Sequence, residues 1–560
     1  MRRAIDVDGA WRQDRATLNN TQMGGLRVVL AILAVAAASA AAAPRVILLV
    51  LADDVGYAQV GFIPGSPAAT GGPGGASLTP RLDALAREGL VLASHYASFW
   101  CTPSRASFLT GRLPVHVQDQ QSFPETPNQG IPRNMTTFAR YFQEANWETS
   151  TQGKWDSGMA TMDHTPLGRG FNHSLISFEH MTDRWTQKIF PGGTACTLYD
   201  ATITDLWQDD GPARALNGTG FSEDLHATAI LDIIAKADVD AAPLLIYYAP
   251  HIAHYPLQVP KAKLDEFAFI TDDETACNAT VPYIYPGSTE PLRCRAQEAA
   301  LMSLLDDTIG GIVDAIIARG WWADTLMLFS SDNGAPLDVS ESGGNNFPLR
   351  GGKYSSWEGG TKVPAFISGG VVPAARRGAT ETGVLHLADW MATLGAVSGV
   401  NTSFDARAAA AGLPPMDSLN MWPLLSGENA TSPRVEIPIS PQVLFSWPYK
   451  LLRGPQDWAG YTSAVYPNAS SVDPALSPNQ WAFCGDGCLF DVRADPEERV
   501  DLAATHPGIV ANMSKRLDEL VPGFFSNADV GVDACPKGTA LCGCWTAVHK
   551  WGGFLGPYQV

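Results

Sequence analysis

The sequence is poor in basic residues. Its 38 lysines and arginines stand against 57 aspartates and glutamates, a formal net charge of −19 at pH 7, and this excess of negative charge argues against general nucleic-acid binding. Long apolar runs are also scarce, because the candidate at residues 28–42 is short and rich in alanine for a membrane span. The 9 cysteines lack the regular paired Cys-x-x-Cys spacing of zinc sites. We find no internal repeat.

The length of the chain indicates more than one domain. A chain of 560 residues is longer than one hydrophobic core usually supports, so we expect two domains, one of them large. The apolar and charged fractions are those of a soluble globular protein. We place the domains at residues 44–434 and 435–560, because the pattern changes beyond residue 434 to short strands and turns.

Residues 1–43 have the layout of a secretory signal. Arg27 precedes the apolar run 28–42, which ends in small residues before Pro44, and this is the order of segments in a signal peptide. A signal anchor is the alternative. Residues 1–22 are polar and long for the start of a signal. We therefore expect them to be an N-terminal extension, with Met23 as the true start.

Three apolar runs end in polar side chains. Residues 46–51 lead to Asp53 and Asp54, residues 243–249 lead to His254, and residues 325–329 lead to Asp332 and Asn333. Such runs are typical of strands buried on both faces of a parallel sheet, whose carboxyl ends meet where α/β sheets place ligands. Asp and Asn oxygens suit Ca²⁺ or Mg²⁺ and not zinc. The pattern predicts a metal site at this edge.

The stretch Cys101-Thr102-Pro103-Ser104-Arg105 predicts a reactive side chain at the start of a short helix. Pro103 suits the first helical position because it has no N–H to leave unpaired, and Gly111 suits the position just past the helix end. Unpaired N–H groups at a helix start favour negative charge. The guanidinium of Arg105 adds donors that suit a tetrahedral oxyanion. A buried cysteine beside a surface arginine is the alternative.

Residues 101–112, Cys-x-Pro-Ser-Arg followed by Leu-Thr-Gly-Arg, resemble the signature of the type I sulfatases. The resemblance implies an α/β, alkaline-phosphatase-like fold with a large, mostly parallel sheet flanked by helices and a smaller C-terminal subdomain with an antiparallel sheet. It implies that a formylglycine-generating enzyme oxidises Cys101 to formylglycine (3-oxoalanine), whose hydrated aldehyde is the nucleophile. It also implies one Ca²⁺, bound by Asp53, Asp54, Asp332, Asn333 and an oxygen at position 101 or on the sulfate.

Three further residues match the family's sulfate site. Lys154, in Gly153-Lys154-Trp155, corresponds to a lysine that contacts the sulfate, and Lys353 corresponds to a second one. His254, before Tyr-Pro, resembles the histidine that assists the leaving-group oxygen, and imidazole suits such acid–base work near neutral pH. These matches predict a sulfate pocket lined by Arg105, Lys154 and Lys353.

Asp156 departs from the family pattern. The family commonly has a histidine after Gly-Lys-Trp, which hydrogen-bonds the formylglycine hydroxyl, whereas this chain has an aspartate. An aspartate accepts the same hydrogen bond but repels sulfate. His164 and His180 are candidates to fill the gap, and structural or surface roles are the alternatives for both.

Sequons and the remaining cysteines agree with passage through the secretory pathway. With Cys101 set aside for chemistry, 8 cysteines remain, an even number for disulfides in an oxidising compartment. Cys277 with Cys294, and Cys484 with Cys488, are plausible local pairs. Eight Asn-x-Ser/Thr sequons predict glycosylation at several sites: Asn134, Asn172, Asn217, Asn278, Asn401, Asn429, Asn468 and Asn512.

We therefore expect a hydrolase of aryl sulfates or sulfated carbohydrates that releases inorganic sulfate, similar to the arylsulfatase and N-acetylgalactosamine-4-sulfatase branch. The expected location is extracellular or lysosome-like, with no stable membrane span after removal of the signal. Two alternatives stay open. One is a phosphoester or phosphonate hydrolase that uses the same metal edge. The other is a non-catalytic binder of sulfated glycans, in which Asp156 marks lost chemistry.

Overall fold

The structure, a computed structural model, describes residues 43–118, 130–189, 203–271, 283–337, 343–465, 481–525 and 542–559. These ranges belong to one compact unit, Ala43–Val560. Residues 1–42, with the predicted signal and Met23, lie outside them. Within the described ranges, no helix has both the length and the apolar character that a membrane crossing needs.

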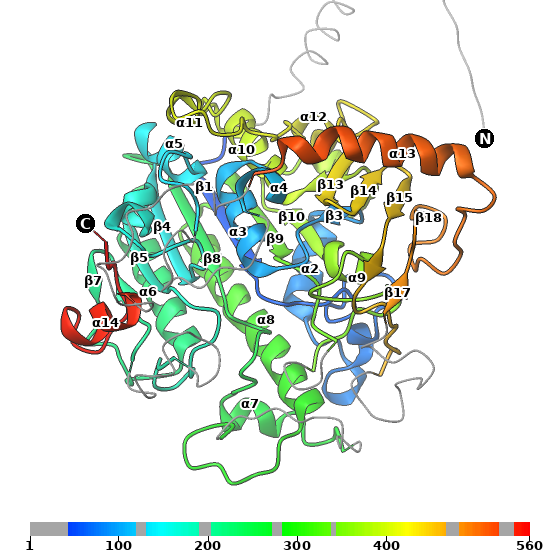
Figure 1. The fold of residues 1–560 in the computed structure, drawn as a ribbon. Coiled ribbons are helices and arrows are strands. Elements are labelled where there is room, and N and C mark those ends of the chain that lie inside the picture. The colour runs from blue at the N-terminus through cyan, green and yellow to red at the C-terminus, as the bar shows by residue number, and fades with distance from the viewer. Residues whose placement is uncertain are drawn as a thin grey trace, which may run out of the picture. The chain divides into compact units, whose positions relative to one another are not determined.

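A ten-stranded sheet forms the centre of this unit (Figure 1). In spatial order the strands are β11 (Ala379–Glu381), β2 (Leu90–Leu92), β10 (Ala365–Ser368), β9 (Thr325–Ser331), β1 (Val46–Ala52), β8 (Leu244–Ala249), β4 (Glu148–Lys154), β5 (His173–Ser177), β6 (Trp207–Gln208) and β7 (Gly211–Pro212). From β9 to β5 the neighbouring strands run parallel, whereas β10 is antiparallel to β9.

The three strands predicted from apolar runs are adjacent in this sheet. β1 lies between β8 and β9 and pairs in parallel with both, from Val46 opposite Leu244 and Thr325 onward. The expected meeting of their carboxyl ends at one edge is therefore confirmed. β4, which carries Lys154 at its end, was not predicted, because its sequence is polar.

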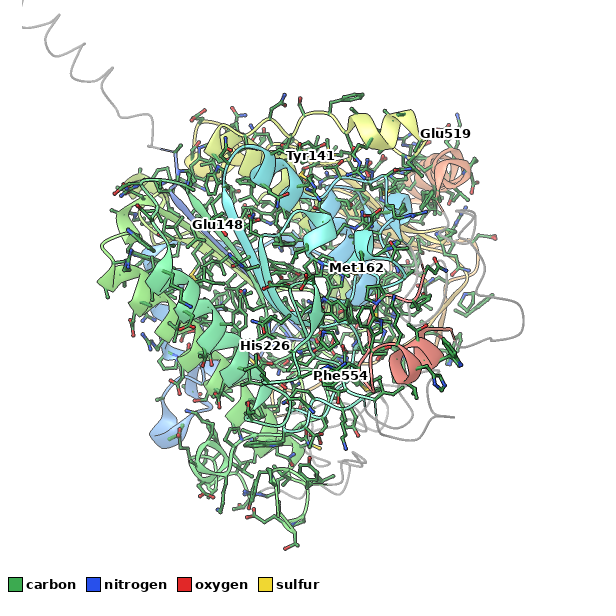
Figure 2. All side chains as sticks on the ribbon, turned by 90° about the vertical axis from the view of Figure 1, so that its left-hand side faces the viewer. Tyr141, Glu148, Met162, His226, Glu519 and Phe554 are labelled. Carbon is green, nitrogen blue, oxygen red and sulfur yellow. A yellow bond between two sulfur atoms is a disulfide. The ribbon has the colours of Figure 1, made fainter. Side chains whose placement is uncertain are left out.

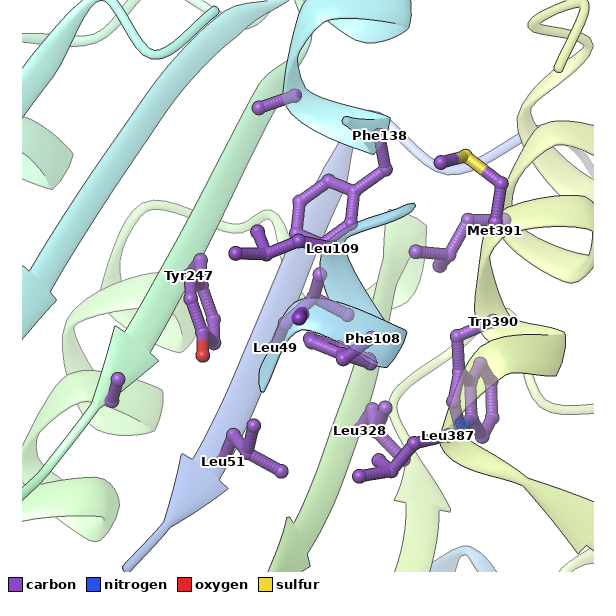
Figure 3. Close-up of a cluster of buried hydrophobic side chains, with 14 of the residues drawn as sticks. Leu49, Leu51, Phe108, Leu109, Phe138, Tyr247, Leu328, Leu387, Trp390 and Met391 are labelled. Atoms are coloured by element: carbon purple, nitrogen blue, oxygen red, sulfur yellow. The ribbon is translucent and has the colours of Figure 1, made fainter. Parts of the chain in front are cut away.

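Helices cover both faces of the sheet, because alternate residues of β1 point to opposite sides. Val46, Leu48 and Val50 pack in a core cluster with α2 (Pro80–Glu88), α6 (Ser222–Lys236) and α8 (Cys294–Ala318). Ile47, Leu49 and Leu51 pack with α3 (Cys101–Thr110), α5 (Phe138–Glu144) and α10 (Trp390–Ser398). Figure 3 shows the second cluster, in which Phe108 and Leu109 of α3 lie over Leu49 and Leu51. These contacts fix α3 against the centre of the sheet.

An antiparallel sheet follows in the C-terminal part, as predicted. Its order is β13 (Glu436–Ser440), β14 (Val443–Ser446), β15 (Tyr449–Leu452) and β18 (Cys488–Asp491). α13 (Pro507–Leu520) packs on it through Met513 and Leu517. The domain boundary after residue 434 stays a prediction.

A buried ion network joins this small sheet to the central part. Lys450 of β15 lies 3.1 Å from a carboxylate oxygen of Glu358 and 3.1 Å from one of Glu498, and all three side chains are fully buried. Glu358 begins α9 (Glu358–Thr361), and its N–H donates to Glu498 over 2.7 Å. The segment that follows Lys353 is thereby fixed to the C-terminal sheet.

The remaining elements are short. Two small sheets pair β3 (His95–Tyr96) with β12 (Leu385–His386) and β16 (Pro455–Gln456) with β17 (Ala482–Phe483). The remaining α-helices are α4 (Pro114–Val117), α7 (Lys261–Asp265), α11 (Ala406–Ala410), α12 (Trp422–Ser426) and α14 (Cys542–His549). Phe554, beside α14 in Figure 2, lies under the guanidinium of Arg214, which ties this tail to the segment around β7.

The predicted disulfide Cys484–Cys488 is confirmed. Cys294 also forms a disulfide, but Cys277 lies outside the described residues, so the pairing of these two stays a prediction. The sequon asparagines Asn134, Asn401, Asn429 and Asn512 are exposed, Asn172 and Asn217 are half-buried, and Asn278 and Asn468 lie outside the described residues.

Candidate active site

Helix α3 places Cys101 at its first residue. The helix begins at Cys101, so Pro103 is its third residue and not its first, as the sequence had indicated. Proline is tolerated there because the first four N–H groups of a helix have no intrahelical partner. Gly111 ends the helix with φ 67°, and a Cβ at this position would lie 2.7 Å from Cβ of Met391. Every residue of α3 is buried.

The ends of β1 and β9 bring the predicted oxygen ligands together. The backbone N–H of Asp54 donates to Asp332 Oδ1 over 3.1 Å, and Asn333 Nδ2 donates to Asp54 Oδ1 over 2.6 Å. The thiol of Cys101 lies 3.8 Å from Asp54 Oδ1. Asp53, Asp54, Cys101 and His254 offer ligand atoms that all lie within 4.8 Å of one another. The polar groups predicted at the sheet edge therefore form one buried cluster.

Three buried cations surround these carboxylates. Lys154 Nζ donates to both oxygens of Asp53 over 2.9 Å. Lys353 Nζ lies 2.8 Å from Asp54 Oδ2, and the Arg105 guanidinium lies 2.7 Å from Asp332 Oδ2 and 3.3 Å from Asp53 Oδ1. Each of the three cations is thus paired with a carboxylate of the edge, and all three lie in the cluster that includes Cys101.

The residues at this edge fit a hard divalent cation. Burial and the neighbouring charges of Asp53 and Asp54 raise the pKa of Asp332, against the attraction of Arg105 and Lys154. Asn333 Oδ1 is buried and has no hydrogen-bond partner among the described residues. A donor set of carboxylate and amide oxygens suits Ca²⁺ or Mg²⁺.

Cys101 is protonated at neutral pH in its unmodified form. Burial raises the pKa of its thiol well above the ordinary value, and Lys154 and Lys353 offset only part of this effect. Since the thiolate is the nucleophilic form of cysteine, this environment does not favour thiol chemistry. The environment of residue 101 suits a nucleophile other than a thiolate.

His254 lies at the same edge, in the loop after β8. Its Nε2 is 3.6 Å from Asp54 Oδ2, and its Nδ1 is 2.6 Å from the carbonyl oxygen of Tyr255. A carbonyl only accepts hydrogen bonds, so Nδ1 carries a proton and Nε2 faces the cluster. Burial, and next the charge of Lys353, lower the pKa of His254 well below its usual value. The imidazole is therefore neutral.

Two residues that the sequence did not single out hold the loop of His254. The Arg184 guanidinium donates to the carbonyl oxygens of His251 over 2.8 Å and Pro256 over 3.1 Å. Glu223 lies 3.4 Å from this guanidinium and accepts the N–H of His251 over 3.0 Å. The partners of Arg184 are backbone atoms of a loop about seventy residues further along the chain and one distant carboxylate, so no sequence signal could have identified it.

Asp156 contacts three residues of the site. Its Oδ1 accepts from the Thr102 hydroxyl over 2.9 Å, and its Oδ2 lies 3.2 Å from His180 Nδ1 and 4.0 Å from Lys154 Nζ. Burial opposes its ionisation, but His180 and Lys154 outweigh this and lower its pKa. His164 Nδ1 instead lies 2.9 Å from the hydroxyl of Thr161. Of the two candidate histidines, the structure brings His180 to Asp156.

The glycine of the Gly-Lys-Trp segment is required by packing. Gly153 has φ 105°, and a Cβ there would lie 2.0 Å from the carbonyl oxygen of Ala249 on β8. Only glycine fits this backbone conformation at such close approach. The close pairing of β4 with β8 carries Lys154 to the site edge.

Comparison with known proteins gives the family. The sulfatase family model matches residues 45–400. Arylsulfatase J from Mus musculus is 28% identical over 524 residues, covering 88% of this chain and 77% of the relative. Arylsulfatase A from Homo sapiens is 27% identical over 530 residues, covering 89% and 90%. N-acetylgalactosamine-6-sulfatase from Rattus norvegicus is 28% identical over 363 residues, covering 62% of each chain.

Solved structures agree in fold. The crystal structure of Ps i-CgsB aligns with a TM-score of 0.66 at 22% identity, covering 87% of this chain and 94% of that one. The PsFucS1 sulfatase from Pseudoalteromonas sp. aligns with a TM-score of 0.61 at 20% identity, covering 90% and 95%. The predicted α/β, alkaline-phosphatase-like fold is confirmed. Because the family model matches more than half of its length, the chain belongs to the sulfatase family, in the arylsulfatase-like branch of sulfuric ester hydrolases.

Proposed function

We propose that this chain hydrolyses sulfate esters of aryl or carbohydrate alcohols through a formylglycine formed from Cys101 and one bound Ca²⁺. The observation that carries the proposal is the convergence of Arg105, Lys154 and Lys353 on the carboxylate edge beside Cys101. Preorganised cations of this kind stabilise charge that develops on transferring oxygens. The neutral, buried thiol of unmodified Cys101 supports a modified residue as the nucleophile.

The two added groups supply distinct chemistry. Formylglycine at position 101, once hydrated, would supply the nucleophilic hydroxyl group, and such covalent catalysis would divide the hydrolysis into two easier steps. Ca²⁺ supplies a positive charge for the sulfate oxygens. The residues that would hold it are Asp53, Asp54, Asp332 and Asn333, and the unpartnered amide oxygen of Asn333 supports this assignment.

The chain's own cations bind and orient the ester. Lys154 and Lys353 would neutralise the sulfate oxygens, since their ammonium groups contact Asp53 and Asp54 at the edge that holds Cys101. Arg105 donates to Asp332 through Nε over 3.1 Å and Nη2 over 2.7 Å. Both contacts are to one oxygen, Asp332 Oδ2, and they keep the positive charge of the guanidinium at the carboxylate edge.

His254 assists the leaving alcohol. Its Nδ1–H is held by the carbonyl of Tyr255, so Nε2 is the atom that faces the reacting ester. Because the neutral imidazole has no proton on Nε2, this atom would first take up a proton and then transfer it to the leaving-group oxygen. A positioned imidazole in this role is common in general acid–base catalysis. Arg184 and Glu223 keep the loop in place.

Asp156 takes the place of the family's usual histidine. Its carboxylate would accept the hydrogen bond that the missing imidazole would accept, and its Oδ2 lies 3.2 Å from His180 Nδ1. The hydroxyl of Thr102 fixes the orientation of the carboxylate. The positive charge of Lys154, 4.0 Å from Oδ2, reduces the repulsion between Asp156 and sulfate.

We further propose a secretory location, oxidised disulfides and maturation by a formylglycine-generating enzyme. The signal-like residues 1–43, the Cys484–Cys488 disulfide and the exposed sequons support the location. Ps i-CgsB was solved in complex with k-i-k-neocarrahexaose, which makes a carbohydrate sulfate ester a substrate to test beside aryl sulfates.

Two measurements test the proposal. The mass of the proteolytic peptide with residue 101, from protein of the native organism, should show loss of the thiol in favour of an aldehyde. Sulfate and phosphate esters of one phenol should then be compared, with Cys101→Ala as the inactive control. An intact cysteine, a strong preference for phosphate, or glycan binding without turnover in the modified protein would each overturn it.

A further inference from the structure

We propose that Trp100, Tyr354 and Trp458 form an aromatic subsite that stacks against the six-membered ring bearing the sulfate ester. All three side chains are half-buried. The substrate class would then be sulfate esters on an aryl or pyranose ring. This inference rests on the proposed function, because it names the part of the ester that lies outside the sulfate pocket.

The aromatic side chains adjoin the nucleophile and a sulfate-binding lysine. Trp100 directly precedes Cys101, and Tyr354 directly follows Lys353. The N–H of Tyr354 donates to the carbonyl of Phe99 over 2.9 Å, which joins the two segments. Lys353 Nζ lies 5.3 Å from the centroid of the Tyr354 ring. A ring attached to an ester oxygen at this pocket would therefore meet these side chains first.

The three rings contact one another in series, at interplanar angles of 73° and 45°, and we call this set the wall. The centroids of Trp100 and Tyr354 lie 6.3 Å apart, and those of Tyr354 and Trp458 also lie 6.3 Å apart. Backbone contacts anchor the segment of Trp458, since Gly351 N–H donates to Gly460 over 2.9 Å. The wall runs from the start of α3 to the loop after β16.

The wall differs from the aromatic core around it. Trp155 and Trp357 have no exposed surface, whereas the three wall residues keep part of theirs. Trp100 Nε1 is buried and has no hydrogen-bond partner among the described residues, although tryptophan N–H groups usually find one. A hydroxyl or ester oxygen of the substrate would provide the missing acceptor.

The backbone of the wall is also unusual. Tyr354 has φ 72° and Trp458 has φ 51°, a left-handed conformation that is uncommon for residues with large side chains. Such conformations gather at ligand sites, where the position of a side chain outweighs their cost. Here the two residues belong to the ring series that begins beside Lys353, whose Nζ lies 5.3 Å from the Tyr354 centroid.

The chemistry of the wall favours the apolar face of a ring over a second sulfate. None of its three members carries a charge, and aromatic faces stack on aryl rings and on apolar ring faces. The sulfate itself is matched by Arg105, Lys154 and Lys353. The wall therefore contributes to recognition of the alcohol part of the ester.

Binding to the full-length Cys101→Ala protein tests this inference without turnover. Calorimetry would give Kd for 4-methylumbelliferyl sulfate, for N-acetylgalactosamine 4-sulfate and for inorganic sulfate. We expect Trp458→Ala in this background to weaken binding of at least one ring ligand by about tenfold and to change that of inorganic sulfate by less than about twofold. The ligand affected identifies the ring as aryl or sugar. Trp458→Phe should keep most of the affinity.

Matched controls keep the result interpretable. Trp545, on α14, is 48% exposed, and Trp545→Ala should leave all three constants unchanged. If Trp458→Ala does not fold, Trp458→Leu replaces it, because leucine keeps apolar bulk without an aromatic face. Unchanged affinity for both ring ligands, or an equal loss for inorganic sulfate, would overturn the subsite. Absence of sulfate release by the modified wild-type enzyme would overturn the proposed function alone.

Discussion

Replacement of Asp156 by alanine should lower kcat at least about tenfold. The variant removes the acceptor of the Thr102 hydroxyl at 2.9 Å and the negative partner of His180 at 3.2 Å. Hydrogen bonds to charged groups contribute about 1.5–3 kcal/mol each, and about 1.4 kcal/mol corresponds to tenfold in rate. Loss of one such contact in the transition state is therefore sufficient for the expected effect.

Asp156→Asn separates charge from hydrogen bonding. It keeps an oxygen for Thr102 but removes the negative charge that lies 4.0 Å from Lys154 Nζ. Two charges at this distance interact by about 1 kcal/mol even at the dielectric constant of water. We therefore expect inorganic sulfate to inhibit this variant about fivefold more strongly than wild type, while kcat is reduced.

The assay is sulfate release from 4-nitrophenyl sulfate, with the state of residue 101 verified by mass in every variant. Asp163 is an exposed aspartate nearby, and Asp163→Ala should match wild type, which controls for loss of negative charge in the segment. A kcat of Asp156→Ala within about threefold of wild type would refute the reasoning. The role would then pass to His180 or His164.

Three further outcomes follow from the geometry. Chelation of divalent cations should abolish turnover and lower Tm, and Ca²⁺ should restore both; full activity in protein shown by mass spectrometry to be metal-free would contradict the metal site. Phe108→Ala should lower the free energy of unfolding by about 3–5 kcal/mol, because Phe108 is 1% exposed beneath the site, whereas Phe404→Ala, at 67% exposure, should change it by less than about 0.5 kcal/mol in denaturant titrations. Burial raises the pKa of Glu298 to about 8 from an ordinary 4.5, so between these values the folded chain retains a proton that the unfolded chain loses, and stability falls as pH rises. The fall in Tm between about pH 5 and about pH 8 should therefore be smaller for Glu298→Gln than for wild type. Equal falls in Tm would exclude this account.

The three buried strands could be predicted because their sequences are uninterrupted apolar runs. β1, β8 and β9 need no polar side chains, since both of their faces are covered. β4 has the same buried position with the sequence Glu-Thr-Ser-Thr-Gln-Gly-Lys. Its polar groups find partners outside the strand, as when Thr149 Oγ1 donates to the carbonyl of Gly170 over 2.8 Å. Such partners come from tertiary packing, and no local pattern indicates them.

Site residues that lie in a sequence motif could be predicted. Site residues whose role depends on tertiary packing could not. Cys101, Lys154 and Lys353 lie in conspicuous sequence strings, and the structure brings them to one cluster. The choice of His180 over His164 as the partner of Asp156 depends on how the chain turns after β5, which neither histidine's sequence neighbours show. The catalytic roles of all these residues stay predictions until the variants are measured.

The ion network of Lys450, Glu358 and Glu498 makes the active site sensitive to substitutions in the C-terminal sheet. Lys450 lies in the C-terminal sheet, but its ammonium group pairs with the carboxylate of Glu358, only a few residues beyond Lys353. Loss of Lys450 would take from both buried acids the cation that lies 3.1 Å from each of them, and a buried charge that loses its partner is strongly destabilising. A substitution of Lys450 on β15 would thus lower enzyme activity although β15 belongs to a separate sheet. Its effect would resemble that of a change in the signature motif itself.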